Sequence, residues 1–324
     1  MDKIRQLLIE YNQNTRQYKD KIKASVKAGE LVEDNAFNGV RILIPPIVAD
    51  NSLEMRSDQW WFNGFLICEP KGIILVDPGV DFYTRFTKTK LSIFDIRTMV
   101  ITHGHSDHIS SLPIFIEKLS RNKTNKVDIF ISDFAYENEL SGYMKKLLSN
   151  VEKFNLVRIS DSNDQIVQKT QLGDEFQFVR LYHSIQDTFG FKVKIDGQLI
   201  GYLSDTGYAI KVRTDKGVFN AEEAEGHFKG IVEKHNHIKD FYSNVNVVVL
   251  NANDLQYNRH SKYHLGGWDM LDLFDNSKLT TLVMHHIPPV NIEGEDTNML
   301  YKLFFHDQCY KVYLPNALGR QVNL

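Results

Sequence analysis

The stretch Thr102-His103-Gly104-His105-Ser106-Asp107-His108 carries three imidazoles and one carboxylate within six residues. The apolar run Met99-Val100-Ile101 leads directly into it, so the end of a predicted strand delivers the cluster. Imidazole and carboxylate ligands in this proportion suit zinc or another borderline divalent ion rather than magnesium or calcium. In an extended loop the first two histidines project to the same side, while the aspartate and the last histidine can turn toward a second point. The loop therefore predicts a site for two metal ions.

Short apolar runs separated by turn residues surround this loop and indicate many hairpin-linked strands. Residues 65–69 and 73–76 form a predicted hairpin. After the cluster, Ser110 or Ser111 can cap a helix that has Pro113 in its first turn. Further strands are predicted at 127–132 and near 176–182, 189–195, 199–203, 245–250, 281–285 and 310–314, and helices from 133 to about 148 and near 268–274 and 296–305. This succession predicts an α/β protein with two packed sheets and helices outside them, a four-layer αββα arrangement.

The chain divides into an N-terminal extension, residues 1–55, and a catalytic domain, residues 56–324. The extension is predicted to be helical because one apolar stripe is formed by Ile4, Leu7, Leu8 and Tyr11. This helix could dock on its own domain, pair with a second subunit in a homodimer, or cap a substrate channel. Within the catalytic domain, a polar and charged segment at about residues 208–244 interrupts the strand rhythm. Its composition predicts an inserted helical segment beside the site.

Charge and composition exclude several classes of protein. Lys and Arg number 38 against 41 Asp and Glu, so a net charge of -3 provides no general field for holding a polyanion, and long nucleic acid is not expected as a partner. Cys68 and Cys309 are too few for a disulfide framework, which favours a reducing compartment. The sequence contains no apolar run of the length that a membrane span needs and no signal-peptide pattern at its start. We therefore expect a cytoplasmic protein without a membrane partner.

The histidine loop resembles the H-x-H-x-D-H signature of the metallo-β-lactamase superfamily, since it also follows a strand and precedes a helix. The upstream stretch Ile74-Leu75-Val76-Asp77-Pro78-Gly79 is similar to the first motif of that superfamily. The resemblance extends from about Trp60 to the C-terminus, with the motifs in the expected order. It implies the four-layer αββα metallo-β-lactamase fold and a metal-dependent hydrolase.

The resemblance also implies a ligand set. Leu181-Tyr182-His183-Ser184 and Gly201-Tyr202-Leu203-Ser204-Asp205-Thr206-Gly207 match later motifs of the family. One metal would then be held by His103, His105 and His183, and the other by Asp107, His108 and His286, with Asp205 shared between them. His285 is the alternative to His286, although alignment of the strand end favours His286 and leaves His285 as a buried residue. Asp77 is expected to support the ligand loop through hydrogen bonds rather than to bind metal.

The stretch from His183 to Gly207 is most similar to the ribonuclease Z and small phosphodiesterase branch of the superfamily. That branch places a histidine before a late helix, and His264 in Lys262-Tyr263-His264-Leu265-Gly266-Gly267-Trp268 matches it, with His260 as a secondary candidate. We predict that His264 acts as general acid or phosphate contact and that Asp107 combines a catalytic role with metal binding. The predicted substrate contacts are Arg259, Lys262, Tyr263 and Tyr208. The pair His235 and His237 is not expected to bind metal, because helical residues two apart point away from each other.

Together these features predict a dinuclear-metal hydrolase, with zinc favoured over manganese or iron, that uses a metal-bridging hydroxide. The favoured substrate is a nucleotide or another small phosphodiester. Transfer-RNA processing is disfavoured because there is no Gly/Pro-rich arm and because Asn251 stands where many relatives have an acidic residue. A lactone, thioester or amide hydrolase of the same fold is the alternative enzyme, and a ligand-sensing or partner-binding module is the alternative of another class.

Overall fold

The computed structural model describes residues 39–45, 63–89, 91–121, 126–161, 166–224, 228–251, 263–285, 311–313 and 320–324. The predicted N-terminal helix and the helix predicted near 296–305 lie outside these residues. No helix in the described ranges has the length and apolar character that a membrane span requires.

The first sheet has seven described strands in the order β17-β1-β2-β3-β4-β5-β6. Strands β3 to β6 run parallel, and β2, β1 and β17 continue the sheet at one edge by antiparallel pairing. Their bounds are β17 (Arg320–Asn323), β1 (Arg41–Ile44), β2 (Phe65–Glu69), β3 (Gly72–Val76), β4 (Ile96–Ile101), β5 (Val127–Ser132) and β6 (Phe154–Ile159). Strands β2 to β5 are buried along their whole length, as expected of strands covered on both faces.

The second sheet repeats this plan with seven described strands in the order β16-β15-β14-β10-β9-β8-β7. Here β10, β14, β15 and β16 are parallel, while β7, β8 and β9 are antiparallel neighbours at the other edge. The bounds are β16 (Lys311–Tyr313), β15 (Thr281–His285), β14 (Val247–Asn251), β10 (Gln198–Leu203), β9 (Phe189–Ile195), β8 (Glu175–Arg180) and β7 (Val167–Lys169). The strands predicted for both sheets are confirmed to within a few residues, whereas β1, β6, β7 and β17 were not predicted.

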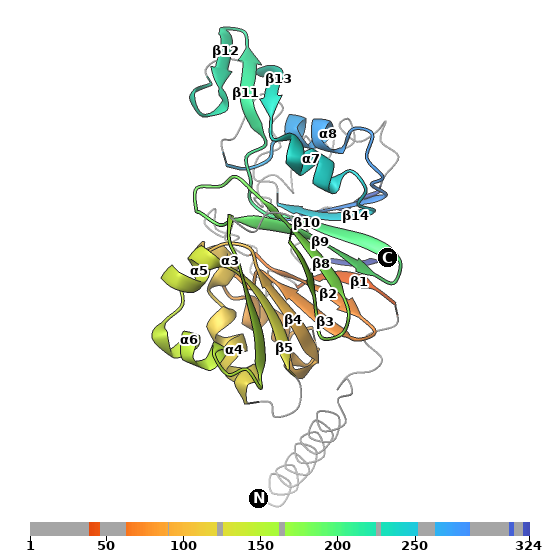
Figure 1. Ribbon diagram of the computed structural model, residues 1–324. Coiled ribbons are helices and arrows are strands. Elements are labelled where there is room, and N and C mark those ends of the chain that lie inside the picture. The colour runs from red at the N-terminus through yellow and green to blue at the C-terminus, as the bar shows by residue number, and fades with distance from the viewer. Residues whose placement is uncertain are drawn as a thin grey trace, which may run out of the picture.

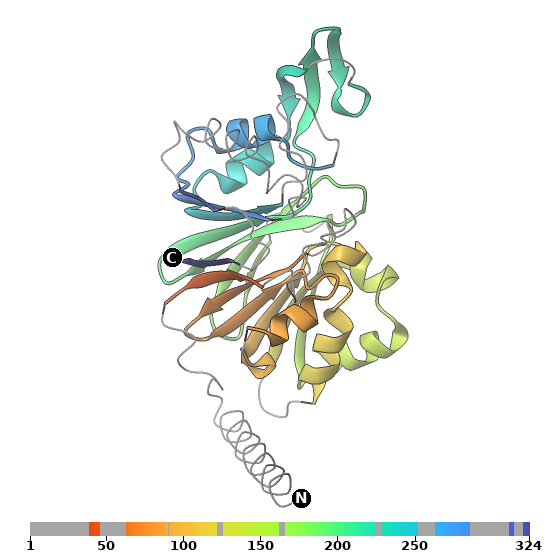
Figure 2. The same cartoon turned by 180° about the vertical axis from the view of Figure 1, so that it is seen from behind.

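The two sheets pack face to face and helices cover their outer faces (Figures 1 and 2). The inner core joins aromatic residues of both sheets, among them Phe65 and Phe130 with Phe176, Phe178 and Phe191. A second cluster lies between the first sheet and its helices, and a third lies between the second sheet and its helices. The helices are α2 (Phe82–Thr87), α4 (Leu112–Ser120), α5 (Asp133–Asn138) and α6 (Gly142–Leu148) on the first sheet, and α7 (Asn236–Tyr242) and α8 (Gly267–Phe274) on the second. The predicted four-layer αββα arrangement is confirmed.

The inserted segment is mainly strand, so the prediction of a helical insertion at 208–244 is wrong. It forms a small sheet of order β12-β11-β13 that projects beyond the second sheet (Figure 1), and among its described residues the one α-helix is α7 at its end. The strands are β11 (Ala209–Thr214), β12 (Gly217–Asn220) and β13 (Phe228–Lys234). Asp215 and Lys216 form the two-residue turn between β11 and β12, and Gly217 after it has a φ of 143°. This turn and the β-branched residues around it outweigh the helix propensity of the charged residues.

Two further boundaries differ from the prediction. Residues 41–44, assigned to the N-terminal extension, form β1 and pair with β2 and β17, so this part belongs to the main domain. The helix predicted from 133 to about 148 is two helices, because Ser141 caps a new N-terminus by accepting a hydrogen bond from the Met144 amide.

The carboxyl ends of β3, β4, β8 and β10 lie at one edge of the double sheet. Asp77 follows β3, the histidine loop follows β4, His183 follows β8 and Asp205 follows β10. The fold therefore collects the motif residues from both halves of the chain at this edge.

Candidate metal centre

The histidine loop leaves β4 in an extended conformation and then makes one helical turn, α3 (Ser106–Ile109). Asp107 and His108 lie on this helical turn, and the His108 ring centroid is 3.9 Å from that of His103. Gly79 makes the turn possible, because a Cβ at this position would lie 1.5 Å from the backbone oxygen of Asp107. The stretch 74–79 therefore needs glycine at position 79, where its backbone contacts the backbone of the ligand loop.

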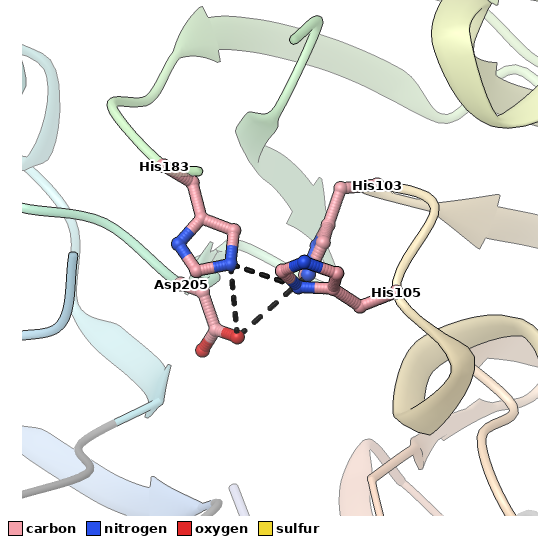
Figure 3. A group of neighbouring side chains, drawn as sticks. All are labelled: His103, His105, His183 and Asp205. Atoms are coloured by element: carbon pink, nitrogen blue, oxygen red, sulfur yellow. Dashed lines mark hydrogen bonds and ion pairs between the residues drawn. The ribbon is translucent and has the colours of Figure 1, made fainter. Parts of the chain in front are cut away.

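One group of candidate ligands consists of His103, His105, His183 and Asp205, whose donor atoms all lie within 4.8 Å of one another (Figure 3). His183 Nε2 is 3.0 Å from His105 Nδ1. The Asp205 Oδ2 atom lies 3.7 Å from His103 Nε2 and 3.8 Å from His183 Nε2. These atoms surround one point, as the ligands of a single ion would.

A second group consists of Asp107, His108 and Asp205. His108 Nε2 lies 3.4 Å from Asp107 Oδ2 and 3.2 Å from Asp205 Oδ2. Asp205 belongs to both groups, so one carboxylate stands between two candidate positions. The structure brings together six of the seven predicted ligands in the expected two sets, and the seventh, His286, lies outside the described residues.

Contacts to the Nδ1 atoms of three histidines fix the orientations of their rings. His108 Nδ1 lies 2.9 Å from Asp77 Oδ2, His183 Nδ1 lies 3.2 Å from the Tyr263 carbonyl oxygen, and His103 Nδ1 lies 3.2 Å from Thr102 Oγ1. In the first two cases only a protonated Nδ1 can form the hydrogen bond, because both partners are acceptors. Nε2 of each ring is then left to face the cluster, which is how metal-binding histidines are usually oriented.

Asp77 is the central support of the ligand loop, as predicted. Its Oδ1 accepts a hydrogen bond from the Thr102 amide at 2.8 Å, and its Oδ2 accepts from Thr102 Oγ1 at 2.6 Å. Oδ2 also accepts from the Tyr202 hydroxyl at 2.9 Å and from His108. The residue is fully buried and has a φ of 43°, a left-handed conformation that aspartate tolerates.

Burial favours neutral imidazoles in the first ligand group. Burial lowers the pKa of His183 to about 4 and holds the pKa of His103 well below its usual value, and burial also lowers the pKa of His105. For His108, burial opposes the charged form, but the carboxylates of Asp107, Asp77 and Asp205 outweigh it and raise the pKa. Neutral imidazole is the form that binds metal.

The donor set fits divalent metal ions. Among the described residues, the buried Nε2 of His103 has no hydrogen-bond partner, although it faces the cluster. A buried acceptor of this kind carries a desolvation cost that a bound cation removes. Imidazole nitrogens together with carboxylate oxygens match zinc and other borderline ions.

The other predicted site residues have different outcomes. His264 lies at the cluster, with its Nδ1 3.5 Å from Asp205 Oδ1, and Tyr263 lines an adjacent pocket. Tyr208 is in the core instead, because its ring is fully buried and its hydroxyl donates to Asp272 Oδ2 at 2.6 Å, so its prediction as a substrate contact is wrong. His285 is buried, as expected, and its Nε2 lies 3.1 Å from the Gly64 carbonyl oxygen. Three further candidates, Arg259, His260 and Lys262, lie outside the described residues.

His235 and His237 do not contribute to either ligand group. The His235 ring stacks on Tyr182, and His237 Nε2 lies 3.3 Å from the Arg180 carbonyl oxygen.

Two asparagines at the site were not predicted. Asn251, at the end of β14, donates from Nδ2 to Asp205 Oδ1 at 3.2 Å and so helps to hold the shared carboxylate. Its position at the end of an apolar strand is the sequence signal that could have identified it as a site residue. Asn63 lies beside His108, with its Nδ2 2.6 Å from the ring Nε2, and nothing in the local sequence marked it.

Comparison with known proteins decides the family. A family model described as Anti-Pycsar protein Apyc1 matches residues 54–220, more than half of the chain, including the histidine loop, His183 and Asp205. The chain belongs to the Anti-Pycsar protein Apyc1 family. An uncharacterised protein of Methanocaldococcus jannaschii is 24% identical over 236 residues, covering 69% of this chain and 74% of that protein.

Solved structures place this Apyc1 family member in the metallo-β-lactamase fold. The metallo-β-lactamase fold protein YhfI from Bacillus subtilis has a TM-score of 0.62 at 11% identity, covering 88% of this chain and 100% of that one. The short form of human tRNase Z has a TM-score of 0.54 at 14% identity, covering 87% of this chain and 98% of that one. The fold expected from the motifs is thereby confirmed.

Proposed function

We propose that the protein is a dinuclear-metal phosphodiesterase that hydrolyses a nucleotide or another small phosphodiester. The observation that carries the proposal is the presence of two ligand groups that share Asp205 at the carboxyl edge of both sheets. A metal-dependent hydrolase agrees with the fold, and the tRNase Z named above is a nuclease on the same fold.

The ligand groups assign a role to each side chain. His103, His105 and His183 would hold one ion, Asp107 and His108 the other, and Asp205 both, with His286 as the further ligand expected from sequence. Two ions held in this way polarise a phosphoryl group and make water a nucleophile near neutral pH. Zinc is the first candidate, and manganese and iron are the alternatives.

We assign to His264 the transfer of a proton to the leaving oxygen. Its ring centroid lies 5.2 Å from that of His183, and its Nδ1 is 3.5 Å from the shared carboxylate. Its side chain retains 20% exposure, whereas Asp205 retains 2%, so a substrate at the cluster can reach the His264 ring. An imidazole can donate a proton to a leaving oxygen, so this residue type suits the task.

Replacing His264 by Gln should lower kcat by about 100-fold or more for a diester with an alkyl leaving group. The loss should be small for bis(p-nitrophenyl) phosphate, because p-nitrophenolate leaves without protonation. Steady-state kinetics on both diesters test this difference, and metal analysis of the variant serves as the control. Equal losses on the two substrates, or a loss of bound metal, would contradict the role as general acid.

The proposed function itself is tested with bis(p-nitrophenyl) phosphate and zinc-loaded protein, next to a chelator-treated sample. Turnover in the loaded sample that disappears on chelation is expected. Fully loaded protein that leaves the diester intact but hydrolyses a lactone or thioester would replace the phosphodiesterase proposal by the carbonyl alternative.

A further inference from the structure

The carboxylate of Asp272 on α8 joins three parts of the fold. Its Oδ2 accepts a hydrogen bond from the Tyr208 hydroxyl at 2.6 Å, and Lys234 Nζ donates to both of its oxygens, at 2.7 and 2.6 Å. Tyr208 follows the Asp205 motif in the chain, and Lys234 ends β13 of the projecting sheet, at whose base α8 lies (Figure 1). One side chain therefore connects α8 to the segment of the shared ligand and to the projecting sheet.

These hydrogen bonds involve an ionised acceptor. Burial alone would raise the pKa of Asp272, but the hydrogen bonds from Lys234 and Tyr208 outweigh it and lower the pKa. Hydrogen bonds to an ionised group are stronger than those between neutral groups. Lys239 Nζ also donates to the Asp272 carbonyl oxygen at 2.6 Å, which ties α8 to α7. The position of α8 is thus fixed by polar contacts as well as by its apolar face.

The N-terminal end of α8 carries the segment of His264. Asp269 Oδ2 accepts a hydrogen bond from the Gly266 amide at 2.9 Å and so caps the helix directly after this segment. Leu265, the residue next to His264, is fully buried in the same core cluster as Tyr208. A displacement of α8 would therefore displace His264 with it.

His264 and Asp205 approach each other from these two connected segments. His264 Nδ1 lies 3.5 Å from Asp205 Oδ1, although the residues are far apart in the sequence. The hydrogen bond between Tyr208 and Asp272 links the two segments through side chains. A catalytic group that is misplaced by about 1 Å can lose about 100-fold in rate, so the fixing of α8 matters for proton transfer.

We propose that Asp272 is a positioning residue that sets the His264 ring at the shared carboxylate by holding α8 against Tyr208 and the projecting sheet. The inference rests on the proposed phosphodiesterase function and on the role assigned to His264, and it adds a residue outside the metal centre to that mechanism. It also gives the projecting sheet a role, since Lys234 binds the same carboxylate.

The test compares two diesters that differ in their need for a proton donor. Asp272→Ala should lower kcat by about tenfold or more for the diester with an alkyl leaving group, because the donor is displaced. The loss on bis(p-nitrophenyl) phosphate should stay within about twofold, because p-nitrophenolate leaves without protonation. Bound zinc should not change. Tyr208→Phe removes one hydroxyl and keeps the buried ring, so it should show a smaller loss of the same selectivity even if Asp272→Ala does not fold.

A double-mutant cycle decides whether Asp272 acts through His264. In the His264→Gln background, Asp272→Ala should cause no further loss on the alkyl diester, because the effects of residues that act as one unit do not add. Asp275→Ala is the matched control, since Asp275 is the C-cap residue of the same helix, is exposed and accepts a hydrogen bond from its neighbour Asn276 at 3.0 Å. It should match the unaltered protein on both diesters.

The outcomes separate this inference from the proposed function. Equal losses on the two diesters, no loss on either, an undiminished loss in the His264→Gln background, or a loss of zinc from Asp272→Ala would overturn the positioning role and leave the phosphodiesterase proposal standing. Unaltered zinc-loaded protein that hydrolyses neither diester would overturn the proposed function and the positioning role with it.

Discussion

Asp205→Asn should abolish turnover, with kcat reduced by about a thousandfold or more, because the ions supply several kcal/mol of charge stabilisation that the variant cannot assemble. The physical reason is the position of the Asp205 carboxylate between the two ligand groups. Asp205 Oδ2 lies within 3.2 Å of His108 Nε2 and within 3.8 Å of His183 Nε2, so it serves both ligand groups at once. An amide of the same shape keeps the fold but provides neither the charge nor the second acceptor that two cations need.

Metal binding gives this prediction a readout that does not depend on activity. Zinc should raise the Tm of the unaltered protein, since a ligand that binds only the folded state stabilises it, and this rise should be lost in Asp205→Asn. The matched control is Asp196→Asn, because Asp196 precedes β10 just as Asp205 follows it and has no contact with the cluster. A variant that keeps full zinc-dependent stabilisation and activity would show that Asp205 is not the shared ligand.

The sequence was most informative where local pattern and chemistry agree. Strands β2 to β5 are mostly apolar and buried along their whole length, and each of them was predicted from an apolar run in the sequence. The ligand loop was equally clear, because three histidines and an aspartate within six residues have few other uses. The two ligand groups required the family resemblance, since the approach of His183 and Asp205 to the loop depends on packing between the two sheets.

The errors have physical causes. The projecting sheet was predicted to be helical because its glutamates and lysines favour helices, whereas the tight turn at Asp215 and Lys216 closes a hairpin that local propensity does not reveal. Tyr208 was predicted to contact the substrate. Its ring instead packs in the core between β10 and the outer helices, with the hydroxyl held by Asp272. Asn63 was missed because its approach to His108 is a tertiary contact across 45 positions.

Asp77→Asn should impair the second metal position and destabilise the fold at the same time. The carboxylate accepts four hydrogen bonds while fully buried, and one of these orients His108 through Nδ1. An amide that turns its NH2 group toward His108 requires Nδ1 to accept, which moves the ring proton to Nε2. His108 could then no longer present Nε2 to a metal, and we expect metal affinity at this position to fall by about 10- to 100-fold. Competition with a chromophoric chelator measures the affinity, and nitrogen NMR of labelled histidine reports the tautomer.

Tyr202→Phe separates the tautomer effect from a general weakening of the hydrogen-bond network. It removes one of the four donors to Asp77, at 2.9 Å, but leaves the bond to His108 in place. The free energy of unfolding should fall by about 1 kcal/mol, the value of one buried hydrogen bond, with little change in metal affinity. Asp77→Asn should lose about 3–5 kcal/mol in denaturant unfolding of the metal-free protein, because His108, whose pKa the carboxylates raise, loses a buried partner. If the two variants lost metal affinity equally, Asp77 would act only through local stability, and its orientation of the His108 ring would not be needed for the second ion.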